Sequence, residues 1–81
     1  MKTIRDLLPG QQGVIRRLLN TGSMRRRLLV IGMIEGTRIE CVGRSPAGDP
    51  AAYLIRGAVI AIRGEDGCGV VIDGREGAVW D

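Results

Sequence analysis

Glycine is the residue that most limits what this chain can fold into. Thirteen of the 81 residues are glycine, about twice the usual share. The longest unbroken apolar segments are Leu28–Ile31 and Ala58–Ile62, far below the ~20 residues that span a bilayer. Such short segments are typical of strands joined by tight turns. We therefore expect one small β-rich domain, with no helical bundle, coiled coil or segment inserted in a membrane.

Apolar and β-branched residues gather in five short segments separated by turn residues. The clearest alternation places Ile39 and Cys41 on one face of a strand and Glu40 on the other. The first segment instead mixes arginine and aliphatic residues on both faces, which suits a strongly curved strand. Arg56-Gly57 predicts a tight hairpin turn between the third and fourth segments. The predicted strands are residues 13–19, 38–44, 51–56, 58–63 and 70–72.

One segment has the spacing of a helix. Ser23 is the expected N-cap, and Gly32 stands where a left-handed residue ends a helix. Between them Met24, Leu28 and Ile31 form one apolar stripe. A helix of nine residues is too short to be stable alone in water, so it must dock on one end of the sheet. The predicted fold is mainly β: a small barrel of about five antiparallel strands with one short α-helix.

The sequence lacks the groups that most enzymes use. It has no histidine and no phosphate-binding glycine motif, so we expect no catalytic residue and no cofactor. Cys41 and Cys68 are 27 positions apart without a C-x-x-C pair, so no metal site is expected either. Cys41 is more simply a small buried residue. Two cysteines and no leader segment predict free thiols in a cytoplasmic protein.

Charge is distributed unevenly along the chain. Residues 1–44 carry nine basic and three acidic side chains, whereas residues 45–81 carry three and six. The run Arg25–Arg27, together with Arg16 and Arg17, can form a basic patch that attracts phosphate or an acidic protein. Nucleic-acid binding usually adds aromatic stacking platforms, and Tyr53 and Trp80 are far along the chain. The pattern therefore favours contact with phosphate or an acidic protein over the reading of bases, with an ordinary solvated surface as the alternative.

Four sequence segments occur in the order and spacing of one known family. They are Leu7-Leu8-Pro9-Gly10 with Gly13, Arg26–Met33 leading to Gly36-Thr37, Ser45–Pro50, and Arg56-Gly57 followed by Ile60–Arg63. In these segments the sequence resembles the ferrous iron transport protein A (FeoA) family, over about residues 3–73. The resemblance implies an SH3-like barrel domain for residues 1–73. Residues 74–81 are then a C-terminal extension, which we expect to be frayed.

The resemblance also implies a function. It indicates a non-catalytic, cytoplasmic accessory protein of bacterial ferrous iron uptake, whose partner is ferrous iron transport protein B, a membrane protein with a cytosolic GTP-binding domain. We expect two kinds of partner contact, one supplying charge and the other a rigid loop that loses little entropy on binding. The residues for these contacts are Arg25, Arg26, Pro46, Gly48, Asp49 and Pro50.

Two alternatives stay open at this point. One is a small basic barrel that binds nucleic acid, and the other is a metal-sensing module that uses Cys41, Cys68 and nearby carboxylates. One segment also departs from the resemblance. The family tends towards a short helical turn at Gly64–Gly69, but Gly67 and Gly69 each disfavour helix by about 1 kcal/mol relative to alanine. A polar, non-helical turn is expected there.

Overall fold

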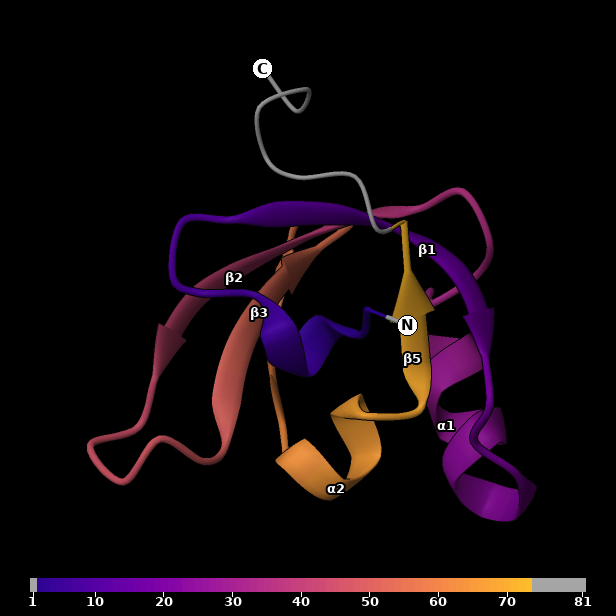
Figure 1. The fold of residues 1–81 in the computed structure, drawn as a ribbon. Coiled ribbons are helices and arrows are strands. Elements are labelled where there is room, and N and C mark those ends of the chain that lie inside the picture. Colours follow the sequence, from indigo (N-terminus) through magenta and orange to yellow (C-terminus); the bar gives the residue numbers. More distant parts are fainter. Residues whose placement is uncertain (1, 74–81) are drawn as a thin grey trace.

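The computed structural model describes residues 2–73. Within this range five strands form one antiparallel sheet in the order β4-β3-β2-β1-β5. Figure 1 shows the sheet curling around η1, with α1 and α2 along its lower side. The elements are η1 (Ile4–Asp6), β1 (Gln12–Leu18), α1 (Gly22–Ile31), β2 (Arg38–Arg44), β3 (Ala51–Ile55), β4 (Ala58–Ile62), α2 (Gly64–Gly67) and β5 (Val70–Ile72).

These elements confirm the predicted fold, since each strand begins and ends within one residue of its predicted bounds. None of the helices in residues 2–73 has the length and apolar character needed to cross a membrane. The extension expected at residues 74–81, with Trp80, lies outside the described residues.

Strand β1 bends from one side of the sheet to the other. Its first half pairs with β2 and its second half pairs with β5, antiparallel in both cases. The register shifts between Ile15 and Arg17, which marks a β-bulge. A bulge bends its strand and raises the local twist, and here it leaves Arg16 and Arg17 both exposed. The strongly curved first strand expected from the mixed pattern is confirmed.

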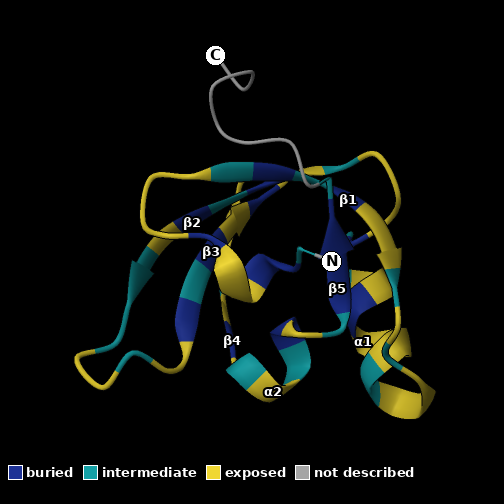
Figure 2. Cartoon of the chain, in the orientation of Figure 1, coloured by how far each residue is buried: buried dark blue, intermediate teal, exposed yellow. Residues whose placement is uncertain are grey.

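The core lies inside the curl of the sheet (Figure 2). Ile39 and Cys41 are both buried, as their alternation predicts. Tyr53, the one aromatic residue in the described range, donates a hydrogen bond from its hydroxyl to the Ile4 carbonyl oxygen at 3.1 Å. The clustered core side chains are Ile4, Leu7, Ile15, Leu28, Met33, Ile39, Cys41, Ala51, Tyr53, Ile55, Ile62, Val70 and Ile72.

Helix α1 begins earlier than the sequence predicts. Thr21, not Ser23, occupies the N-cap position, because the Arg25 amide donates to the Thr21 carbonyl (3.4 Å) and so closes the first turn two residues sooner. The position of the N-cap could not be predicted from a capping side chain, because the side chain of Thr21 makes no hydrogen bond to the helix. The end is as predicted: Gly32 has a φ of 113° and its amide donates to the last-turn carbonyls. Within the described chain, Leu28 is the one buried side chain of α1.

The segment expected to be a non-helical turn forms the short helix α2, so that expectation was wrong. Gly67 in α2 and Gly69 just after it are sites of close packing. A Cβ on Gly67 would lie 3.2 Å from Ile4 Cγ1, and a Cβ on Gly69 would lie 2.7 Å from Asn20 Oδ1. Asn20 also donates from Nδ2 to the Asp66 carbonyl at 3.0 Å. Contacts with η1 and with the chain after β1 therefore outweigh the cost of glycine in a helix, which is about 1 kcal/mol per residue relative to alanine.

Candidate partner-binding surfaces

The Pro46–Pro50 loop joins β2 to β3 at the lower left of Figure 1. Two backbone bonds close it: the Gly48 amide donates to Ser45 (2.7 Å), and the Ser45 amide donates to Pro50 (3.0 Å). Asp49 Oδ1 accepts a hydrogen bond from the Gly64 amide at 2.7 Å, which ties the loop to the start of α2. Pro46, Asp49 and Pro50 are exposed. The loop is thus held in one shape while its side chains remain accessible.

Arg44, which the sequence analysis did not single out, holds the loop from behind. Its Nη2 donates to the carbonyls of Arg5 (2.9 Å) and Leu7 (2.7 Å), and its Nη1 donates to Gly48 (3.4 Å). One guanidinium therefore joins η1 to the loop. A hollow of about 240 Å³ lies beside it, and Asp49 contributes to its wall. No sequence signal marks this role, because all three acceptors are backbone oxygens and two of them lie 37 and 39 positions from Arg44.

The arginine run on α1 does not act as one patch. Successive residues on a helix point about 100° apart, and the three guanidinium groups go different ways. Arg25 donates from Nη1 to the Leu18 carbonyl at 2.9 Å, beside the end of β1. Arg26 is exposed. Arg27 instead lines a groove next to β4.

Arg25 lies with the arginines of the β1 bulge. A hollow of about 190 Å³ is lined by Arg16, Arg17 and Arg25, together with the partly exposed apolar side chains of Leu29 and Ile34. We call these five residues the arginine surface. The expected grouping of Arg16 and Arg17 with the α1 arginines is confirmed for Arg25. Glu35 lines the same hollow, so three cationic side chains and one acidic side chain leave a positive balance. Cationic and apolar groups together suit an acidic, amphipathic protein segment.

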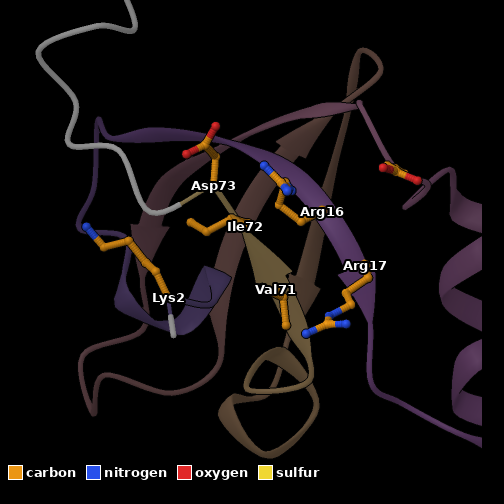
Figure 3. A pocket seen from close by; sticks show the side chains of 7 residues that line it. Lys2, Arg16, Arg17, Val71, Ile72 and Asp73 are labelled. Atoms are coloured by element: carbon orange, nitrogen blue, oxygen red, sulfur yellow. The ribbon is translucent and has the colours of Figure 1, made fainter.

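The basic region continues from the arginine surface across β5. An open depression of about 620 Å³ is lined by Lys2, Arg16, Arg17, Glu35, Val71, Ile72 and Asp73. Figure 3 shows Arg16 and Arg17 on one side of Val71 and Ile72, with Lys2 on the other side in this view. Three cationic and two acidic side chains give the depression a positive balance. The Pro46–Pro50 loop joins β2 to β3, whereas the basic residues lie on β1 and α1. The two predicted kinds of contact therefore form separate surfaces.

The two open alternatives gain no support from the described residues. Tyr53 is 2% exposed, so between residues 2 and 73 no aromatic ring is available to stack on a base. Cys41 is buried, while Cys68 is exposed and its thiol donates to the Glu65 carbonyl at 3.2 Å. Both thiols are free. Over the same range, no three His, Cys, Asp or Glu side chains gather in a way that could hold a metal ion.

A curled antiparallel sheet, filled by aliphatic side chains and carrying its polar surfaces outside, defines a small SH3-like barrel domain. The family model for the FeoA domain matches residues 2–73, and the chain belongs to this family. It is 32% identical over 68 residues to a fusion protein of Fe(2+) transport protein A and the Fe(2+) transporter FeoB from Porphyromonas gingivalis. That alignment covers 84% of this chain and 8% of the fusion protein, so the chain spans a small part of its relative.

Two solved structures share the fold. The solution structure of iron(II) transport protein A from Clostridium thermocellum has a TM-score of 0.84 and 28% identity, over 89% of this chain and 44% of that one. The crystal structure of Stenotrophomonas maltophilia FeoA complexed with zinc, described as a prokaryotic SH3 domain protein, has a TM-score of 0.81 and 22% identity. This match covers 90% of this chain and 91% of the Stenotrophomonas maltophilia protein. The SH3-like fold implied by the sequence motifs is confirmed.

Proposed function

We propose that this protein is a non-catalytic accessory of ferrous iron uptake that acts in the cytoplasm by binding the soluble region of a FeoB-type transporter. The observation that carries the proposal is the Porphyromonas gingivalis protein, in which a domain similar to this chain is fused to such a transporter. Fusion holds two domains at a millimolar effective concentration, which is useful when the domains act on one another. We infer that this chain associates with a transporter region of the same kind.

The contacts that we assign to this association are those predicted from the sequence. Arg25 and Arg26 on α1 supply positive charge, and the first of these is joined by Arg16 and Arg17 in the arginine surface. The loop residues Pro46, Gly48, Asp49 and Pro50 supply the second contact. Because the loop is already held by its own backbone bonds and by Arg44, binding would order few additional groups.

The direct test is a titration of this protein with the cytosolic region of a FeoB-type transporter from the same organism, with and without guanine nucleotide. We expect binding that weakens as salt rises, because charge attraction is screened. Arg25→Glu combined with Arg26→Glu should weaken the complex. Arg38→Glu is the control for a charge reversal elsewhere, since Arg38 is also exposed but lies on β2. Absence of binding by the unmodified protein in both nucleotide states would refute the proposal.

A further inference from the structure

Helix α1 buries its apolar stripe only in part. The stripe of Met24, Leu28 and Ile31 docks on the core as expected, but Leu28 alone among them is fully buried. Met24 and Ile31 pack against the core only in part. They form one wall of a groove whose other wall is residues 60–62 of β4, with a free volume of about 140 Å³. An apolar groove is therefore left unfilled between a helix and a strand.

The strand on the other side of this groove is an edge of the sheet. Among the described residues β4 pairs with β3 alone. Arg56 and Gly57, with φ values of 51° and 85°, form the two-residue turn that makes Ile55 and Ala58 a hydrogen-bonded pair. In an antiparallel ladder such pairs alternate, so the backbone groups of Val59 and Ala61 point away from β3. They are available to a further strand.

Nothing in the sequence of β4 protects this edge. Natural edge strands usually carry charged side chains, proline or bulges that prevent pairing with another chain. The five residues of β4 are all apolar, and their register with β3 is regular throughout. The charges nearest the groove are on its rim: Arg27 from α1, Arg63 after β4, and Asp66 from α2. Their balance is positive, which favours a segment with an acidic residue beside its apolar one.

We propose that the groove between α1 and β4 binds an extended segment of the partner, which adds to β4 as a further strand and inserts one apolar side chain between the two walls. Strand addition takes its affinity from main-chain hydrogen bonds and its specificity from side-chain pockets. A volume of 140 Å³ suits one such side chain, since an engineered cavity of about 150 Å³ binds benzene. The inference rests on the proposed function, because the partner is the same transporter region.

A second copy of this chain is a poorer occupant. Each copy carries a net charge of +3, so two copies repel one another. Strand β4 itself has no acidic side chain to meet Arg27 and Arg63. The occupant we assign is therefore an extended segment of the partner with an aliphatic residue next to an aspartate or glutamate.

Two variants test the groove from its two sides. Ala61→Pro removes an amide that we place on the outer edge, a position where proline is tolerated in edge strands. Met24→Glu places a negative charge on the helix wall. Val42→Glu is the matched control, because it also places a negative charge at an exposed valine, and Val42 lies on β2 away from the groove and from the α1 arginines. Circular dichroism and urea denaturation establish that each variant is folded.

The probe is the cytosolic region of the FeoB-type transporter, added to the full chain in a calorimetric titration. We expect Ala61→Pro and Met24→Glu each to weaken binding about tenfold or more, and Val42→Glu to leave it within about twofold. Hydrogen exchange of the Val59 and Ala61 amides should slow in the complex. If both groove variants bind like the unmodified protein, or these amides exchange as fast as before, the groove inference is wrong while the proposed function stands.

Two further outcomes separate the groove from its rivals. If the unmodified protein does not bind the transporter region at all, the proposed function fails and the groove inference fails with it. Sedimentation of the protein alone measures self-association. A dimer that Ala61→Pro abolishes would identify a second copy as the occupant of β4 and overturn the assignment.

Discussion

The contribution of the Tyr53–Ile4 hydrogen bond to stability can be calculated and tested. Tyr53→Phe removes one hydroxyl from a side chain that is 2% exposed. The Ile4 carbonyl then loses one of its two hydrogen bonds, the 3.1 Å bond from the Tyr53 hydroxyl, and keeps the bond from the Leu7 amide. A hydrogen bond of this kind contributes about 0.5–1.5 kcal/mol to stability, and the ring itself still fits. We expect the free energy of unfolding at pH 7 to fall by that amount, measured by urea denaturation.

The same side chain makes stability depend on pH. Burial is the main cause that raises the pKa of Tyr53 from 10.0 to about 12. Above pH 10 the unfolded chain loses the phenol proton while the folded protein keeps it, so the stabilisation is complete below pH 10 and is lost as the pH rises towards 12. At pH 11, midway in this window, the loss relative to Tyr53→Phe is about 1.4 kcal/mol, since one pKa unit corresponds to ~1.36 kcal/mol.

The assay compares the two proteins by urea denaturation at pH 7, 9 and 11. The stability difference should be constant between pH 7 and 9 and should narrow by pH 11, because the Phe variant has no phenol to titrate. Tyr53 is the single tyrosine of the chain, so ultraviolet absorbance of the phenolate reads its pKa directly. A native phenol that titrates near pH 10 would show that burial does not raise the pKa of Tyr53. A stability difference below about 0.5 kcal/mol at pH 7 would show that its hydrogen bond does not stabilise the fold.

Three further predictions concern the loop, the helix end and the thiols. Asp49→Ala should lower the free energy of unfolding by about 1 kcal/mol, because the Gly64 amide loses its acceptor; equal stability in urea would contradict this. Gly32→Ala should cost about 1–2 kcal/mol, since φ is 113° there, and a thermal melt unchanged from the unmodified protein would disprove it. With a thiol reagent, exposed Cys68 should react in the native protein and buried Cys41 only after denaturation; two thiols reacting at once would show that Cys41 is accessible.

Local patterns predicted the parts of this fold that depend on neighbouring residues. The strand at Arg38–Arg44 begins and ends where its alternation predicts, and Gly32 ends α1 in the left-handed conformation. Both follow from backbone preferences that act over a few residues. Helix α2 was missed because Gly67 in it and Gly69 just after it pack against Ile4 and Asn20, which are about 50 positions or more away in the sequence.

The candidate surfaces were likewise predicted only where they depend on residues that are neighbours in the sequence. From the sequence alone one could find the charged run on α1 and the rigid Pro46–Pro50 loop, because both are contiguous. The placement of α1 against the sheet decides the rest: Arg25 lies with the β1 arginines, while Arg27 faces β4. The role of Arg44 depends on carbonyl groups of η1, more than 35 residues earlier in the chain.

Residue types and short-range spacing are enough to identify this chain as a small, glycine-rich β domain with an aliphatic core, and its ordered motifs identify its family. These properties can be predicted without knowledge of any long-range contact. Which side chains share a surface, and which strand edge stays unpaired, depends instead on how the chain packs. The curl of the sheet leaves β4 at an edge and sets α1 beside it, and for this reason the groove is lined by residues from distant parts of the chain.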